Sequence, residues 1–134
     1  KQKTAYEIGV RLVGSEMCIR VRVSSYNHCV YCITSHSQSV RELSGDPILA
    51  DILVTNYRAA QLSARQRVIL DYAWKMTSIP QEVCEVDRQV LSDCGFKAEE
   101  IFEINDVIAY FNYTNRMTHG IGIEPNKEYF GMNR

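Results

Sequence analysis

The chain has 134 residues, of which 46% are hydrophobic and 23% are charged, and its formal net charge is −1. This composition is typical of one globular domain, and its basic residues form no run or stripe, so neither nucleic acid nor an anionic membrane is expected as a partner. No apolar stretch approaches the ~20 residues needed to span a bilayer, and no secretory signal pattern is present.

The cysteines indicate the compartment. There are five of them, Cys18, Cys29, Cys32, Cys84 and Cys94. An odd number without an export signal argues against a disulfide-rich secreted scaffold and favours a reducing compartment. We therefore predict a cytoplasmic location, in which a Cys-x-x-Cys pair is more often catalytic or metal-binding than a structural disulfide.

We interpret residues 1–21 as a segment that does not belong to the natural protein. Their apolar positions fit neither a helical nor a strand period well. Residues 1–7 and 12–20 resemble the translation of a sequencing-library adapter, with a short variable spacer between the two blocks. We predict that this segment is an adapter-derived artefact and exclude it from functional reasoning. The domain would then begin inside a helix near residue 22.

The next segments are expected to be helical. The first helix should cover residues 29–44 and end at Gly45-Asp46-Pro47, and a short one should follow over residues 47–57. Ser63 and Gln66 form the pattern S-x-x-Q, which predicts a capping box at the start of a third helix.

Two more helices are expected towards the C-terminus. Ser78 and Gln81 repeat the capping pattern, with Pro80 in the first turn. The helix that they open should stop at Gly95 and point four apolar residues inward, namely Val83, Val86, Val90 and Leu91.

The last helix should run over residues 98–119 and end at Gly120 and Gly122. It carries polar and apolar residues at helical spacing, namely Ile101, Ile104, Ile108, Phe111 and Asn115. No alternating strand pattern appears. We predict a single all-α domain over residues 22–126 and a polar C-terminal tail over residues 127–134.

Cys29, Cys32 and His36 form the candidate site. On a helix, residues three and four apart share a face, so these three side chains should lie on one side. Asn27 is a plausible N-cap. The positive end of the helix dipole would then favour the thiolate form of both cysteines.

This arrangement suits redox chemistry. His36, one turn after Cys32, could take a proton from that thiol or return one to a leaving group. A thiolate that attacks an O–O bond becomes a sulfenic acid, and a second thiol within reach condenses with it to a disulfide. Cys29 lies close enough in sequence to Cys32 to supply that second thiol.

Two other interpretations stay open from the spacing alone. Cys29, Cys32 and His36 could be three zinc ligands, with Cys84, Cys94 or His119 as a fourth. Alternatively, Cys29 and Cys32 could be a buried structural pair, because free cysteine is among the most buried residue types.

A family resemblance favours the redox interpretation. The segments SSYNHCVYCITSHSQSVRE, LDYAWKMT, VLSDCGFKAEEIFEINDVIAYFNYTNRM and GIGIEP resemble the carboxymuconolactone decarboxylase superfamily. Within it, the chain is similar to the alkylhydroperoxidase AhpD-like branch, particularly its peroxidase-related proteins, over about residues 22–126. The core Asn-x-Cys-x-Tyr-Cys-x-x-x-His is specific for that branch.

The resemblance implies both a fold and an activity. It implies an all-helical homo-oligomer that reduces peroxides with its thiols, without metal or haem. By position, Cys32 would be the peroxidatic thiol, Cys29 the resolving thiol and His36 part of a proton relay. The expected partners are a peroxide substrate and an unidentified dithiol electron donor, and no cofactor is expected.

Other polar residues receive smaller roles. His28 and Tyr31 are possible accessory residues, but the sequence favours a solvated His28 near the cap, and Tyr31 is at least as compatible with packing against a neighbouring helix. Asn112, Asn115 and Arg116 interrupt an apolar helix, so they are expected to find polar partners, at the mouth of the site or at a subunit contact.

One departure from the family pattern concerns the acid of the relay. The pattern places a glutamate twelve residues before the first cysteine, a position that Met17 occupies here, with Glu16 one residue away. A slip of one residue turns a helical side chain by about 100°. Besides the peroxidase, two alternatives therefore remain: a non-catalytic helical oligomer with a zinc site, and an inactive truncated member of the family.

Overall fold

The protein, described here from a computed structural model, is all-helical, as the sequence predicts. The structure describes the backbone of residues 5–134 and the side chains of residues 14–134, and it contains no strand in that range. The α-helices are α1 (Ala5–Tyr26), α2 (Val30–Ser44), α3 (Leu49–Asn56), α4 (Ala64–Ser78), α5 (Glu85–Asp93) and α6 (Ala98–Ile121). Three short 3-10 helices are η1 (Tyr57–Ala59), η2 (Pro80–Glu82) and η3 (Lys127–Phe130).

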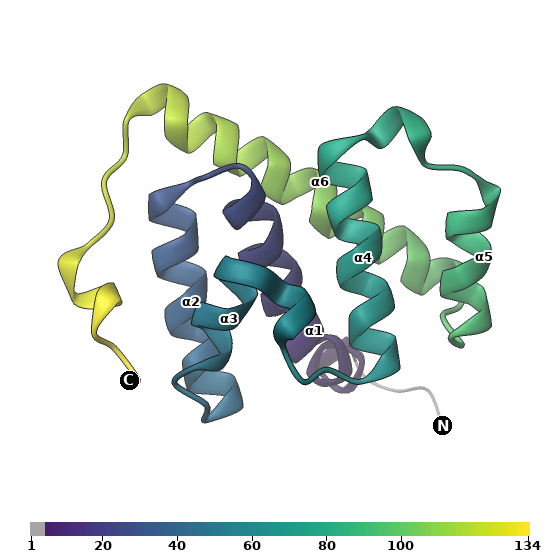
Figure 1. Ribbon diagram of the computed structural model, residues 1–134, viewed down its shortest axis with the longest axis horizontal. Coiled ribbons are helices and arrows are strands. Elements are labelled where there is room, and N and C mark those ends of the chain that lie inside the picture. The colour runs from purple at the N-terminus through teal and green to yellow at the C-terminus, as the bar shows by residue number, and fades with distance from the viewer. Residues whose placement is uncertain (1–4) are drawn as a thin grey trace.

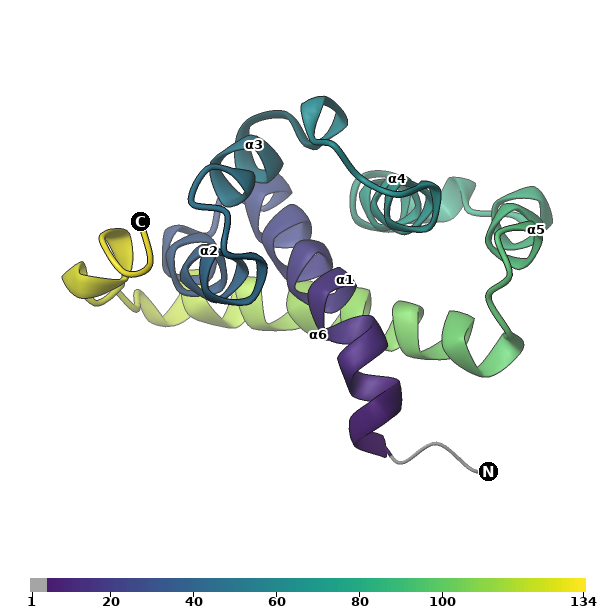
Figure 2. The same ribbon diagram turned by 90° about the horizontal axis from the view of Figure 1, so that it is seen from below.

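Helix α1 lies at the centre of the fold. It packs against α2, α3, α4 and α6, and α6 crosses beneath it along the length of the molecule (Figures 1 and 2). The buried core gathers side chains from all of these helices, among them Val21, Leu53, Leu70 and Ile108. Fully burying such a side chain contributes ~1.5–3 kcal/mol, so the core depends on α1 as its common partner.

Two helix ends follow the sequence prediction. Helix α2 ends at Gly45, whose φ of 68° is left-handed and suits glycine. Helix α4 begins with the predicted capping box. The Ser63 hydroxyl accepts from the Gln66 N–H at 3.2 Å, and the Gln66 side chain accepts from the Ser63 N–H at 2.9 Å.

The second predicted capping box is wrong. Helix α4 continues through Ser78, whose hydroxyl donates back to the Trp74 carbonyl at 2.7 Å. Pro80 opens the short η2 instead of an α-helix. Helix α5 begins only at Glu85, where the Asp87 carboxylate accepts from the Cys84 N–H at 2.8 Å. Asp87, and not the predicted Gln81, therefore caps this helix.

The apolar face predicted for this helix is also mostly wrong. Leu91 is buried, but Val86 and Val90 are exposed, and Val83 precedes α5 and is half-buried. Helix α5 lies at one end of the molecule (Figure 1) and packs against α4 and α6. With neighbours on so few sides, α5 buries only part of its apolar surface.

The adapter-like segment forms the first part of α1. The helix is continuous from Ala5 to Tyr26, and Cys18 and Ile19 belong to the buried core. The weak apolar period in this segment is therefore overridden by tertiary packing on several sides. Residues 1–4 lie outside the described residues, and the adapter origin of residues 1–21 stays a prediction.

The C-terminal segment packs along α2. The Arg41 guanidinium donates to the carbonyls of Tyr129 and Met132 at 2.9 and 2.8 Å, and Arg134 pairs with Asp51 on α3 at 2.9 Å. The tail predicted from its polar composition is thus held by two arginines.

Among the residues that the structure describes, no helix is both long enough and apolar enough to cross a membrane.

Candidate functional site

The candidate site lies where the chain turns from α1 into α2. Asn27 and His28 link the two helices, and His28 takes a left-handed φ of 54°. Cys29 follows in an extended conformation as the N-cap of α2, and its sulfur accepts from the Cys32 N–H at 3.4 Å. Cys29 and Cys32 therefore stand on either side of the first turn of α2.

Asn27 is not the N-cap that the sequence suggested. Its own N–H still bonds to the Val23 carbonyl at 3.1 Å, because the last turn of α1 extends over it. Its side-chain amide donates instead to Asn112 and Asn115 on α6, at 2.9 and 3.0 Å. Asn27 therefore ties the cysteine-bearing turn to α6.

Both thiols are buried and free. Cys29 and Cys32 are exposed by only 1% and 4%, and no disulfide joins them. Burial, followed by a hydrogen bond with the Cys32 thiol, raises the pKa of Cys29 to about 12. The expectation of a Cys29 thiolate is therefore wrong, because desolvation outweighs the favourable end of the helix. Cys29 rests as a thiol at neutral pH.

Thr118 on α6 completes the surroundings of the thiols. The Cys32 thiol donates to the Thr118 hydroxyl at 3.7 Å from sulfur to oxygen, and that hydroxyl donates to the Thr114 carbonyl at 2.8 Å. Sequence reasoning missed Thr118, because 86 residues separate it from Cys32. Its only local signal is that it belongs to the polar end of an otherwise apolar helix.

His36 lies one turn further along α2 and is largely buried. Its ring meets Phe111 edge-on, with 5.1 Å between the ring centroids. Burial, and then the positive charge of Arg20, lower the pKa of His36 to about 4. The imidazole is therefore neutral at pH 7. Among residues 14–134, no hydrogen bond joins it to Cys29 or Cys32.

Arg20 on α1 lies near His36. The Arg20 guanidinium lies over the Phe111 ring, 4.5 Å from its centroid, and forms an ion pair with Glu16. Among the described residues, Glu16 pairs with Arg20 and forms no hydrogen bond with His36. Met17, at the register of the family glutamate, is half-buried and packs against the core. An arginine, not an acid, is thus the charged group beside His36.

A buried polar network holds α6 against the end of α1. Asn115 is fully buried and donates to the Ser24 hydroxyl at 3.1 Å, while its carbonyl oxygen accepts from Asn27. Asn112 accepts from Asn27 and donates to Thr77 at 3.2 Å. The asparagines therefore find polar partners inside the fold, and their expected place at the mouth of the site or at a subunit contact stays a prediction.

The remaining candidates lie around this turn. His28 is exposed and Tyr31 is half-buried. His119 at the end of α6 contacts the Asn27 carbonyl through Nε2 at 3.0 Å. Arg116 donates to Asn112 at 3.0 Å.

The residues proposed as zinc ligands do not converge. Within the described part of the chain, no group of three or more histidine, cysteine and acidic side chains has a metal-binding arrangement. Cys84 is exposed at the start of α5, and Cys94 follows at its end. The geometry therefore gives no support to a zinc site built on Cys29 and Cys32.

Two solved structures share both fold and sequence with the chain. An uncharacterized peroxidase-related protein from Silicibacter sp. TM1040 is 44% identical with a TM-score of 0.89, over 99% of this chain and 66% of that one. An alkylhydroperoxidase AhpD core, also an uncharacterized peroxidase-related protein, from Ralstonia eutropha JMP134 is 34% identical with a TM-score of 0.86, over 100% of this chain and 67% of that one. The chain thus spans about two thirds of their length.

A third structure supports the fold alone. A protein of unknown function from Agrobacterium tumefaciens, named as a candidate antioxidant defence protein AhpD, is 22% identical with a TM-score of 0.74, over 91% of this chain and 86% of that one. No protein-family model matches the chain, and no curated protein matches it. The identity and coverage of the first two structures, with the shared all-helical fold, show that the chain belongs to the AhpD-like peroxidase-related proteins.

Proposed function

We propose that the protein is a thiol-dependent peroxidase that reduces hydroperoxides through Cys32, Cys29 and His36 in antioxidant defence. The observation that carries the proposal is the pair of free thiols across the first turn of α2. One of them contacts a hydroxyl from α6. The family membership supports the same chemistry.

The first step oxidises Cys32. Its thiolate attacks the terminal oxygen of the hydroperoxide, the O–O bond breaks, and the sulfur becomes a sulfenic acid. The leaving alkoxide takes up a proton and departs as an alcohol. Thr118 supports this step, because its hydroxyl can turn from the Thr114 carbonyl to donate to the Cys32 thiolate.

The second step uses Cys29. Its sulfur attacks the sulfenic sulfur, a disulfide forms, and the sulfenic oxygen leaves as water. In total, one hydroperoxide and two thiols give one alcohol, one water and one disulfide. A dithiol donor must then reduce the disulfide by exchange. The high pKa of Cys29 suits a thiol that reacts second, because it stays protonated until Cys32 is oxidised.

The proposed part of His36 is proton transfer. Neutral His36 has a free ring nitrogen that can take up a proton, and its pKa of about 4 means that the imidazolium passes this proton readily to the leaving alkoxide. Because no hydrogen bond joins it to either thiol, the proton would pass through the substrate or a water molecule. Tyr31 and His28 remain possible accessory residues on the same turn.

We also propose that the protein works as a homo-oligomer in the cytoplasm. Helix α6 carries a row of exposed apolar side chains three and four residues apart, namely Tyr110, Tyr113, Met117 and Ile121. This spacing puts them on one face of the helix. An exposed apolar face of this kind is typical of a protein–protein contact.

The decisive experiment follows thiol oxidation by mass spectrometry. The reduced protein is mixed with cumene hydroperoxide, and the loss of two hydrogen atoms at Cys29 and Cys32 is measured against time. A Cys29→Ser variant should stop at the Cys32 sulfenic acid, which dimedone traps, and a Cys32→Ser variant should not react at this site. Cys84→Ser serves as the control, because Cys84 lies outside the site and is exposed. Undiminished peroxide consumption by Cys32→Ser would refute the proposal.

The adapter origin of residues 1–21 needs a separate test. Resequencing the gene upstream of the Val21 codon should reveal a different segment, with a glutamate twelve residues before Cys29. Reads that reproduce Lys1 to Arg20 in genomic DNA would contradict the adapter prediction. If the segment is replaced, the protein with the restored glutamate should react faster with peroxide than the present chain.

A further inference from the structure

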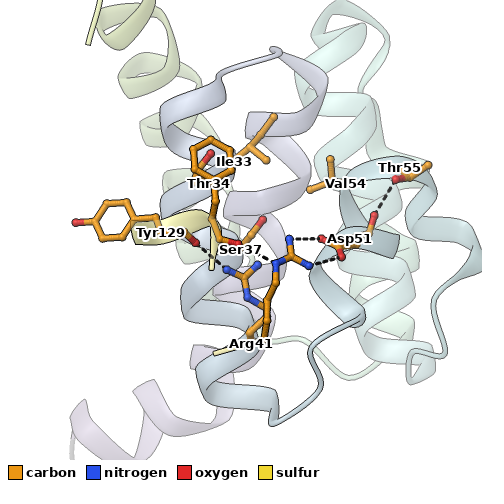
Figure 3. A pocket seen from close by; sticks show the side chains of 10 residues that line it. Ile33, Thr34, Ser37, Arg41, Asp51, Val54, Thr55 and Tyr129 are labelled. Atoms are coloured by element: carbon orange, nitrogen blue, oxygen red, sulfur yellow. Dashed lines mark hydrogen bonds and ion pairs between the residues drawn. The ribbon is translucent and has the colours of Figure 1, made fainter. Parts of the chain in front are cut away.

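A cavity lies beside α2, and neither Cys29 nor Cys32 is among its lining residues. It has a volume of about 270 Å³ and is open on one side. Helices α2 and α3 and the C-terminal segment form its walls (Figure 3). Because α2 presents Cys32 and His36 on one side and Ser37 and Arg41 on another, the cavity is distinct from the candidate peroxidase site.

Arg41 is the first feature that a ligand could use. The residue is only 3% exposed, and its guanidinium donates from Nε and Nη2 to two backbone carbonyls. Among the described residues, its Nη1 has no hydrogen-bond partner and no carboxylate pairs with it, because Asp51 is taken by Arg134. A buried cation whose own hydrogen bonds go only to neutral carbonyls is costly, and Asp51 acts on Arg41 only at longer range. Burial, followed by the charge of Arg134, lowers the pKa of Arg41.

Ser37 is the second and independent feature. It stands one turn before Arg41 on α2, is 6% exposed, and lines the same cavity. Its hydroxyl is buried and has no hydrogen-bond partner among the described residues. A buried hydroxyl without a partner has given up its hydrogen bonds to water and gained none in return. Once the Ser37 hydroxyl turns towards the cavity, an acceptor oxygen there would satisfy both Ser37 and Arg41.

The rest of the lining favours an organic ligand. Ile33, Val54 and Phe130 contribute apolar surface, and Tyr129 turns its carbonyl towards Arg41 while its ring points away (Figure 3). The side-chain charges that face the cavity are Arg41, Arg134 and Asp51, which leave one positive charge in excess. An inorganic anion would use the charge but not the apolar walls.

We propose that this cavity binds a small organic carboxylate, whose carboxylate group is held by Arg41 and Ser37 and whose apolar part lies against Ile33, Val54 and Phe130. The site is independent of the proposed peroxidase chemistry. Because the C-terminal segment forms one wall, such a ligand would also fix that segment on α2.

The test is isothermal titration calorimetry of the whole chain with sodium benzoate at constant ionic strength. Saturable binding of benzoate is expected, with clearly weaker binding of benzyl alcohol, which lacks the charge, and of inorganic phosphate, which lacks the apolar part. If benzyl alcohol binds as tightly as benzoate, the cavity recognises only the apolar part of the ligand, and the proposal is overturned. Equal binding of phosphate would overturn the carboxylate assignment.

The Ser37→Ala variant makes the test specific. A hydrogen bond to a charged group contributes ~1.5–3 kcal/mol, so the variant should bind benzoate about tenfold more weakly or worse. Its melting temperature without ligand should match or exceed that of the unmodified protein, because the substitution removes an unpaired buried hydroxyl.

A matched control lies on the same helix. Ser39 donates to the Ser35 carbonyl and does not line the cavity, so Ser39→Ala should bind benzoate normally. The Arg41→Met variant should lose binding. Unchanged affinity in Ser37→Ala would overturn the proposal even if Arg41→Met fails to fold. The Cys29→Ser/Cys32→Ser double variant should bind benzoate like the unmodified protein.

Discussion

Cys32 and Thr118 meet across the interface between α2 and α6, where the thiol donates to the threonine hydroxyl at 3.7 Å. The hydroxyl has its own acceptor in the Thr114 carbonyl, so in the resting protein it serves Cys32 as an acceptor only. Once Cys32 is a thiolate, the same hydroxyl can reverse and donate. This contact joins the reactive turn to the C-terminal end of α6.

Replacing Thr118 by valine should slow the oxidation of Cys32. Valine keeps the shape but cannot donate to a thiolate, and the loss of one such bond is worth about tenfold in rate. Thr118→Ser, which keeps the hydroxyl, should react nearly as fast as the unmodified protein. Stopped-flow measurement of disulfide formation with cumene hydroperoxide checks this. Equal rates for the valine and serine variants would show that the hydroxyl has no part in the reaction.

His36 should make the stability of the protein depend on acid. Its pKa is lowered from 6.5 to about 4 in the folded protein, so the unfolded chain binds a proton first as the pH falls. The contribution of His36 to the free energy of unfolding should therefore be constant above pH 6.5. It should fall between pH 6.5 and 4 and change no further below pH 4. The total loss is at most about 3 kcal/mol.

Urea unfolding at a series of pH values measures this dependence. The His36→Gln variant is the control, because glutamine does not titrate and should flatten the curve between pH 6.5 and 4. A variant curve parallel to that of the unmodified protein would assign the acid sensitivity to other groups.

Arg20 should hold the pKa of His36 down through its charge. Burial is the larger cause and the guanidinium the second. The Arg20→Gln variant should therefore raise the pKa of His36, but not to the value of a free histidine. NMR titration of the His36 ring protons reports this directly, with Arg88→Gln as a distant, exposed control. A His36 pKa that stays at about 4 in Arg20→Gln would leave burial as the sole cause.

Asn115 should be one of the most sensitive positions for stability. In Asn115→Leu, Asn27 keeps its bond to Asn112, but the buried Ser24 hydroxyl loses its donor. We expect a loss of ~2–3 kcal/mol in urea unfolding. The exposed Asn126→Ala should change stability by less than ~0.5 kcal/mol. If Cys29 is alkylated faster in Asn115→Leu than in the unmodified protein, the network also shields this thiol.

The exposed row on α6 should hold subunits together. In Tyr113→Glu, a charge at the middle of the row would oppose the burial of Met117 and Tyr110 in a contact. Sedimentation velocity should show a smaller species than the unmodified protein, with an unchanged circular dichroism spectrum. Val86→Glu on α5 tests an exposed apolar residue outside this helix face. An unmodified protein that sediments as a monomer would remove the proposal of a homo-oligomer.

The local parts of the fold could be predicted from the sequence. Ser63 and Gln66 lie three residues apart, so their capping box forms within one turn, and the left-handed Gly45 ends α2 for a reason contained in its own residue type. Ser78 and Gln81 carry the same pattern but do not form a cap, because Pro80 opens a 3-10 turn. A short pattern therefore predicts a cap only where neighbouring residues allow the helix to begin.

The candidate site likewise has features that depend on the sequence alone and features that depend on the tertiary structure. The sequence by itself determined that Cys29, Cys32 and His36 share the start of one helix, because that depends only on spacing. Only the tertiary structure decided that Asn27 bonds to α6, that Thr118 contacts Cys32, and that Arg20 lies beside Phe111 near His36. It also decided the protonation of Cys29, because desolvation depends on how many helices surround a side chain, and no local pattern records that number.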